Sequence, residues 1–123
     1  MPPTLTGLIP MAHALDVQRS ADFYKLLGME IRGSLRHTDG VLRWVRLACG
    51  QADLMLARAS GPVDAEQQAV LFYLYATDLI GLRAHLLANS VKVSEITYPD
   101  YMPKGEIRLV DPDGYVLLVG QTG

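Results

Sequence analysis

The sequence has 123 residues, half of them apolar and 20% charged, which is enough material for one packed domain. A net charge of -2 gives no electrostatic footprint for DNA, RNA or an anionic membrane, so we expect neither a nucleic-acid nor a membrane partner. The single cysteine, Cys49, excludes an internal disulfide and a thiolate metal cluster. Without a recognisable secretion signal or membrane span, the sequence predicts a cytoplasmic protein.

The first half of the chain predicts a strand, a helix and three further strands. An extended segment leads to Asp16, whose carboxylate is suited to cap a helix over 18–27. Gly28 suits the left-handed residue that ends helices, and a short strand over 29–31 follows. Two longer strands, 41–48 and 52–57, are separated by a hairpin break at 49–51. Residues 59–62 then predict a linker.

The second half repeats this order. Asp78, 62 positions after Asp16, precedes a predicted helix over 80–88 that stops at Ser90. Strands are predicted over 91–93, 106–110 and 115–120, the last two joined by the Pro- and Gly-containing turn at 111–114. Because neither half is large enough to bury a good core, we expect one α+β domain over 1–123, made of two paired modules at about 5–59 and 67–121.

Two stretches carry a family resemblance: DVQRSADFYKLLGME at 16–30 and GEIRLVDPDGY at 105–115. They resemble the opening helix and closing hairpin of the vicinal oxygen chelate superfamily, which includes glyoxalase I, extradiol dioxygenases, and fosfomycin and bleomycin resistance proteins. The resemblance implies two βαβββ modules whose strands form a cupped mixed sheet, with the helices outside and a ligand inside. It does not imply one activity, since a single fold hosts unrelated chemistries.

In metal-dependent members of this superfamily the ligands lie on inward-facing strand positions. The resemblance carries these positions onto Ile9, Met55, Leu71 and Leu118, none of which offers oxygen or nitrogen to a divalent ion. A two-residue slip would bring in Asp53 but would not convert all four positions. We therefore expect no metal, no cofactor and no catalytic residue. A metal-dependent lyase or dioxygenase with its ligands elsewhere is the alternative.

Strand alternation predicts the lining of the cup, because successive side chains point to opposite faces. The predicted ligand-binding residues are Met11, His13, Trp44, Arg46, Met55, Tyr73, Tyr75, Glu106 and Arg108. This mixture suits an aromatic or amphipathic organic molecule, with Arg46 and Arg108 available to a carboxylate or phosphate. Trp44 and the tyrosines are equally suited to fill the cup or to form a dimer contact. Residues 98–101 are expected to be ordinary surface rather than a lid.

Three classes of function follow. The leading hypothesis is a metal-free protein that binds a drug or metabolite and resembles the bleomycin resistance group. The second is an enzyme, either metal-dependent or using His13 and Glu106 as acid and base. The third is a regulatory or assembly module whose cup is filled by its own side chains. In each case we expect a homodimer, because exposed sheet edges tend to pair and two-fold dimers are the commonest assembly.

Overall fold

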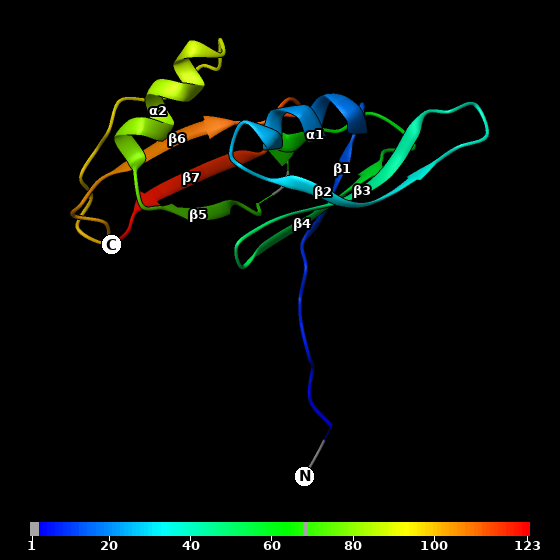
Figure 1. The fold of residues 1–123 in the computed structure, drawn as a ribbon, viewed down its shortest axis with the longest axis horizontal. Helices are drawn as coiled ribbons and strands as arrows, with labels where there is room; N and C mark the ends of the chain where they lie inside the picture. The colour runs from blue at the N-terminus through cyan, green and yellow to red at the C-terminus, as the bar shows by residue number, and fades with distance from the viewer. Residues whose placement is uncertain (1–2, 68) are drawn as a thin grey trace. The chain divides into compact units, whose positions relative to one another are not determined.

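The computed structural model describes residues 3–67 and 69–123, which form two compact units dividing between Val63 and Asp64 (Figure 1). Each unit contains one helix packed on its own sheet. The predicted α+β class and the internal repeat are therefore confirmed, whereas the pairing of the two units into a single domain stays a prediction. None of the helices in the described residues is long and apolar enough to cross a membrane.

Unit 1 is a four-stranded mixed sheet with one helix on it. Its elements are β1 (Met11–Ala14), α1 (Val17–Lys25), β2 (Glu30–Arg36), β3 (Leu42–Cys49) and β4 (Ala52–Arg58). The strands lie in the order β1-β4-β3-β2, with β1 parallel to β4 and the other pairs antiparallel. Figure 1 shows α1 lying along the sheet, which leaves the other sheet face without a helix in this unit.

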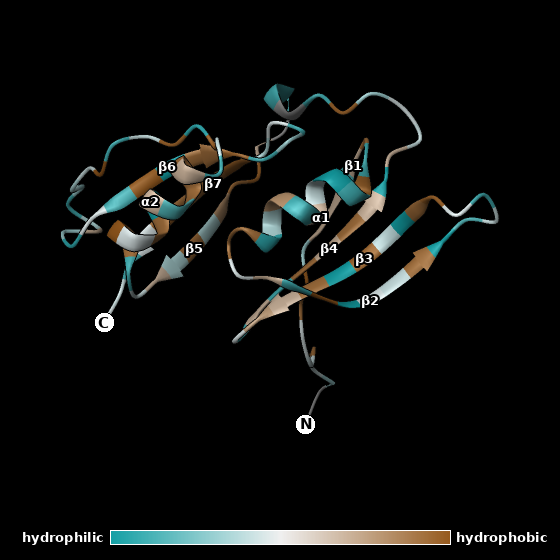
Figure 2. Ribbon diagram, turned by 45° about the horizontal axis from the view of Figure 1, so that its top comes forward, coloured by the Kyte–Doolittle hydropathy of each residue, from teal (hydrophilic) through white to brown (hydrophobic). Residues whose placement is uncertain are grey.

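The helix of unit 1 forms where the sequence predicts it. The side chain of Asp16 accepts a hydrogen bond of 3.1 Å from the backbone N–H of Arg19, and Gly28 adopts a positive φ of 92° just beyond the helix end. The helix buries Val17, Ala21 and Tyr24. The strand residues of the same core are at most 6% exposed: Ala12, Ala14, Leu42, Val45, Leu47, Leu54 and Leu56. The alternation of hydrophobic and hydrophilic residues along the strands appears as colour bands in Figure 2.

Unit 2 repeats the arrangement with three strands. Its elements are η1 (Ala65–Gln67), β5 (Phe72–Ala76), α2 (Leu79–Ala88), β6 (Glu106–Val110) and β7 (Val116–Gln121), with the strands in the order β5-β7-β6. The carboxylate of Asp78 caps α2 by accepting from the backbone N–H of Gly81 at 2.9 Å. Leu79 and Leu86 pack from the helix onto the core strands.

The predicted strand at 91–93 is wrong. In place of a strand, residues 93–97 make two isolated bridges to β6, Val93 with Leu109 and Thr97 with Glu106. Between them, the hydroxyl of Ser94 accepts from the backbone N–H of Arg108 at 2.8 Å, where a regular ladder would use a backbone carbonyl. A side chain that replaces the backbone acceptor interrupts the strand.

Other boundaries shift by a few residues. Both helices begin one residue earlier than predicted, and α1 ends at Lys25 rather than at residue 27. The strand predicted at 29–31 runs from Glu30 to Arg36, because β2 pairs along most of β3. Pairing with a neighbouring strand extends a segment whose own sequence gives only a short strand signal.

Candidate ligand-binding site

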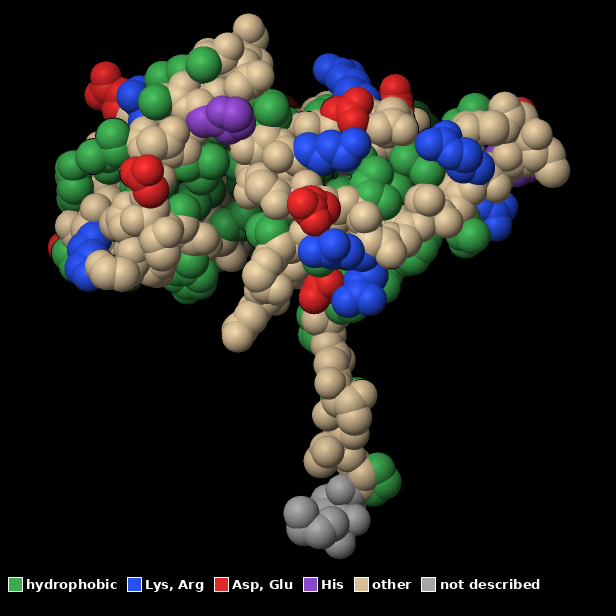
Figure 3. All heavy atoms as spheres, viewed as in Figure 1, with side chains coloured by type: hydrophobic (Ala, Val, Ile, Leu, Met, Phe, Trp, Pro, Cys, Tyr) green, Lys and Arg blue, Asp and Glu red, His purple; other side chains and the backbone are tan. Residues whose placement is uncertain are grey.

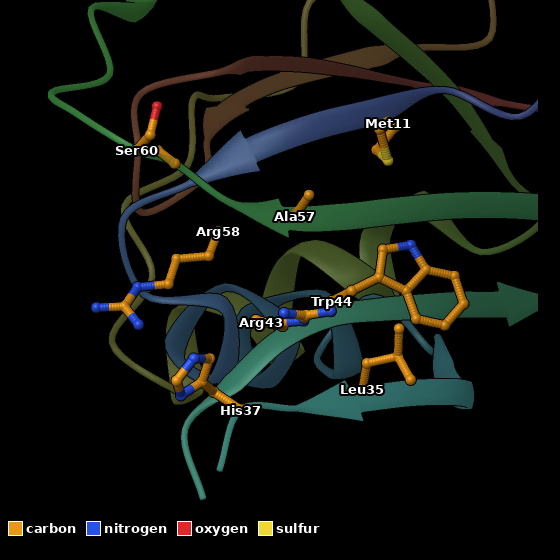
Figure 4. A pocket seen from close by; sticks show the side chains of 9 residues that line it. Met11, Leu35, His37, Arg43, Trp44, Ala57, Arg58 and Ser60 are labelled. Atoms are coloured by element: carbon orange, nitrogen blue, oxygen red, sulfur yellow. The ribbon is translucent and has the colours of Figure 1, made fainter. Parts of the chain in front are cut away.

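Unit 1 carries a hollow of about 730 Å³, a volume in the range of small-molecule sites (Figure 4). It opens along β2, β3 and β4 and is bordered by the start of β1. Its lining residues are Met11, Leu35, His37, Arg43, Trp44, Ala57, Arg58, Ala59 and Ser60.

The register of three strands builds the apolar floor of this hollow. Trp44 on β3 is paired with Leu35 on β2 and with Ala57 on β4. Directly paired residues point to the same sheet face, so these three side chains form one row. The small Ala57 leaves one flank of the indole open, and a Cβ added at Gly33 would lie 3.4 Å from the indole ring. The six-membered ring of the Trp44 indole therefore lies over Gly33.

A β-bulge in β3 brings a charged residue beside Trp44. Trp44 pairs with Leu35, but Leu42 pairs with the very next residue of β2, so Arg43 is one residue too many for the ladder. Leu42 and Val45 are both buried in the core, at 4% and 0% exposure. The side chains of Arg43 and Trp44, which lie between them in the sequence, both point away from the core. A bulge redirects a side chain in this way. Simple alternation would have turned Arg43 into the core, which is why the sequence analysis missed it.

The polar end of the hollow is basic. In Figure 4, Arg58 and His37 lie at the end away from the indole of Trp44, and Arg43 lies between that end and the indole. The Nδ1 atom of His37 lies 3.6 Å from a carboxylate oxygen of Asp39. Within the described part of the chain, no hydrogen bond or ion pair engages the guanidinium of Arg43 or Arg58. The site thus combines an apolar floor with two unpaired positive charges.

The predicted lining residues of unit 1 share one sheet face. Met11 and Trp44 line the hollow, and Met55 is paired with Met11 in the neighbouring row. His13 is exposed and lies in the row of Ala57. Arg46 lies on this face too, and its Nη2 and Nε atoms donate to one carboxylate oxygen of Asp53 at 2.9 and 3.1 Å. A carboxylate on the neighbouring strand of its own sheet already engages this guanidinium.

The predicted lining residues of unit 2 form a separate cluster around Glu106. Tyr75 and Glu106 are both paired with Gly120, and Tyr73 and Arg108 are both paired with Leu118, so the four side chains lie on one sheet face. Glu106 is 7% exposed and accepts the hydroxyl of Tyr73 at 2.6 Å.

Tyr101 completes this cluster from a loop. Its hydroxyl donates to the second carboxylate oxygen of Glu106 at 2.9 Å, although the sequence analysis expected residues 98–101 to be ordinary surface. Two turns fold the loop back, with hydrogen bonds from Met102 N–H to Pro99 O and from Gly105 N–H to Met102 O. Gly105 has a φ of 120°, which favours glycine. Pro99 and Gly105 were the available sequence signals for this return.

The phenol groups of Tyr73 and Tyr101 are expected to ionise at a higher pH than an ordinary tyrosine. Burial, followed by the hydrogen bond to Glu106, raises the pKa of Tyr73, and the hydrogen bond to Glu106 raises the pKa of Tyr101. The stability that comes from these raised pKa values is fully present below pH 10.0, the ordinary pKa of tyrosine. It is lost as the pH rises from there through the pKa of the folded state. In an ultraviolet titration of phenolate between pH 9 and 12, Glu106→Gln should make Tyr101 ionise at lower pH, whereas Tyr73 should shift less because its burial remains. An unchanged titration curve would contradict this assignment.

The four positions expected to hold a metal in metal-dependent relatives carry no suitable donors. Met55 lies in β4 and Leu118 in β7, while Ile9 and Leu71 immediately precede β1 and β5. Aliphatic side chains offer no ligand atom, and a thioether suits only soft metals. Across residues 3–67 and 69–123, no three His, Cys, Asp or Glu side chains gather as a metal site. The side chains at these positions do not fit a divalent catalytic ion.

The family model for the Glyoxalase/Bleomycin resistance protein/Dioxygenase superfamily matches residues 12–119, so the chain belongs to this superfamily. No curated protein sequence matches the chain.

Three solved structures show the same fold. A bleomycin-binding protein complexed with bleomycin is 20% identical, with a TM-score of 0.74 over 97% of this chain and 100% of the other. A bleomycin resistance determinant encoded on transposon Tn5 is 21% identical, with a TM-score of 0.75 over 96% and 98%. TnmS3, an antibiotic binding protein from Streptomyces sp. CB03234, is 19% identical, with a TM-score of 0.74 over 99% and 100%.

Proposed function

We propose that this chain is a cytoplasmic protein that binds a small organic molecule, a drug or a metabolite, without a catalytic metal. The observation that carries the proposal is the hollow of about 730 Å³ on the Trp44 face of unit 1. Its floor of Trp44, Leu35 and Met11 offers an aromatic wall and flexible apolar contacts, which suit a flat ring system. The likeness to bleomycin-binding and antibiotic-binding proteins supports a binding role.

The proposal also covers the other predicted ligand-binding residues, each within its own unit. In unit 1, His13, Met55 and Arg46 lie on the sheet face that carries the hollow. In unit 2, Tyr73, Tyr75, Glu106 and Arg108 form a separate aromatic and charged face. A homodimer also belongs to the proposal, because β1 and β2 are the edge strands of the unit 1 sheet. Size-exclusion chromatography with light scattering tests it, and a monomeric mass at micromolar concentration would refute the dimer.

Replacing the indole is expected to weaken binding. Trp44→Ala should reduce affinity for a flat aromatic ligand by about tenfold or more, because it removes the stacking surface and the apolar area that the ligand covers. Trp44→Phe should keep part of the affinity. Ligands are found first by quenching of the fluorescence of Trp44, the one tryptophan in the sequence, and affinities of the variants are then measured by calorimetry.

The matched control is Leu87→Ala, which removes a 47% exposed apolar side chain from α2, outside the hollow. It should bind like the unmodified chain. Equal affinities for Trp44→Ala and Leu87→Ala would show that the ligand sits elsewhere.

The metal-free part of the proposal has its own test. Elemental analysis of the purified protein, followed by titration with divalent metals, should find no stoichiometric tight metal, since Ile9, Met55, Leu71 and Leu118 cannot bind one. A stoichiometric metal would overturn this assignment and favour a metal-dependent lyase or dioxygenase with ligands at other positions.

A further inference from the structure

We infer that the ligand carries a negatively charged group, a carboxylate or a phosphate, which Arg43 and Arg58 hold at the basic end of the hollow. This inference rests on the proposed binding function and names the chemical class of its ligand: an aromatic anion. Four independent features of unit 1 support it.

The first feature is the placement of Arg43. The β-bulge turns this side chain out of the core and into the lining next to Trp44. A ligand whose ring lies on the indole therefore has a guanidinium within reach of its substituent. Arg58 approaches from the end of β4, so the two arginines come from different strands.

The second feature is that these two arginines are unpaired while others on the same sheet are not. Arg46 is engaged by Asp53 at 2.9 Å, and Arg32 by Glu30 at 3.2 Å. Among the described residues, Arg43 and Arg58 have no such partner. Two neighbouring positive charges without a counter-ion favour an anion that enters between them.

The third feature is the composition of the lining. None of its nine residues is Asp or Glu. The carboxylate of Asp39 lies 3.6 Å from the Nδ1 atom of His37 and accepts a hydrogen bond from the backbone N–H of Val41 at 2.9 Å. An approaching anion thus meets positive or neutral groups along the lining itself.

The fourth feature is the charge of the whole unit. Residues 1–63 contain seven Arg and Lys against five Asp and Glu, whereas residues 64–123 contain four against eight. The net acidity of the chain therefore belongs to unit 2. Figure 3 shows several Arg and Lys side chains over the unit that contains α1 and β2, interspersed with Asp and Glu. A net positive unit attracts anionic ligands to its surface.

The chemistry of arginine fits this role. Its planar guanidinium donates two parallel hydrogen bonds to a carboxylate or phosphate, and it stays charged at every physiological pH. A ligand with an aromatic ring and an anionic substituent would match the apolar floor and the basic end together.

The experiment compares aromatic acids with their neutral amides. By calorimetry at low salt, the unmodified chain should bind 2-naphthoate and biphenyl-4-carboxylate about tenfold or more tightly than the corresponding amides, as one charge-assisted contact implies. Arg43→Gln and Arg58→Gln should each reduce that preference, because each should weaken binding of the acid more than binding of the amide. Naphthyl phosphate, measured in parallel, identifies which anion the pair prefers.

The matched control is Arg19→Gln, an exposed arginine on α1 outside the hollow, which should keep the full preference. Circular dichroism confirms that all three variants fold. Equal binding of acid and amide by the unmodified chain would overturn this inference and leave the proposed function intact. Binding of neither member of any pair would overturn both. If Arg19→Gln weakened the preference as much as Arg43→Gln and Arg58→Gln do, the preference would come from the net charge of the unit, and the inference would be overturned.

Discussion

Replacing Leu56 by alanine is expected to lower the free energy of unfolding by about 3 kcal/mol, since large-to-small changes in packed cores cost about 2–5 kcal/mol. Leu56 is fully buried on the helix side of β4, among side chains from α1 and β3. The change removes apolar contacts and leaves a cavity that the sheet cannot close. Urea unfolding followed by circular dichroism measures the loss, with an unchanged m-value showing that the unfolding transition is otherwise the same.

The matched control lies one residue away on the same strand. Met55 points to the opposite face, which carries the hollow, and is only partly buried, so Met55→Ala should cost about 1 kcal/mol or less. Equal costs for the two substitutions would mean that the two faces of β4 have been assigned incorrectly.

Replacing Glu106 by alanine is expected to destabilise the protein by about 2 kcal/mol, because hydrogen bonds to charged groups contribute about 1.5–3 kcal/mol. The substitution removes the acceptor of both the Tyr73 and Tyr101 hydroxyls. Tyr101 recovers bonding to water because it is exposed, so the larger part of the cost comes from Tyr73. Thermal and urea unfolding at pH 7 measure it.

Glu30→Ala serves as the comparison for Glu106→Ala. The side chain of Glu30 is 68% exposed and pairs with Arg32 on the surface, so its removal should change stability by less than about 0.5 kcal/mol. Tyr73→Phe should reproduce part of the cost of Glu106→Ala, and combining the two changes should cost less than their sum. Strict additivity would indicate that the hydrogen bond contributes nothing.

The fold was predictable because several signals agreed along each half of the chain. Asp16 and Asp78 both cap helices, and the apolar positions of the strands alternate as a half-buried sheet requires. Local pattern failed at residues 91–93, where the hydroxyl of Ser94 replaces a backbone acceptor. A sequence pattern of apolar residues does not reveal which acceptor a neighbouring strand will use.

The site was predictable to the extent that alternation holds. Alternation points Met11 and Trp44 to the face where they line the hollow, and it offered Arg46 and Arg108 to an anionic group, although Asp53 engages Arg46. It missed Arg43, because a bulge is a departure from alternation that arises from the length mismatch between two paired strands. The signal was Arg43 itself. Strict alternation would place this charged side chain in the core beside Leu42 and Val45, so the strand had to be irregular at that point.

Tyr101 was missed for a different reason. It reaches Glu106 from a loop whose return is determined by backbone turns rather than by any side-chain period. Pro and Gly in a sequence indicate that a loop turns, but they do not indicate which side chain the loop brings to a given partner.

The bulge in β3 also separates the position proposed to contact a ligand from the residues that form the core. Arg43 has no partner in the ladder with β2, and its neighbours Leu42 and Val45 keep their places in the core. The residue at this position is therefore free to vary in charge and length without changing the register of the sheet. Descendants of such a chain could acquire new ligands through this single position while inheriting an unchanged folding core.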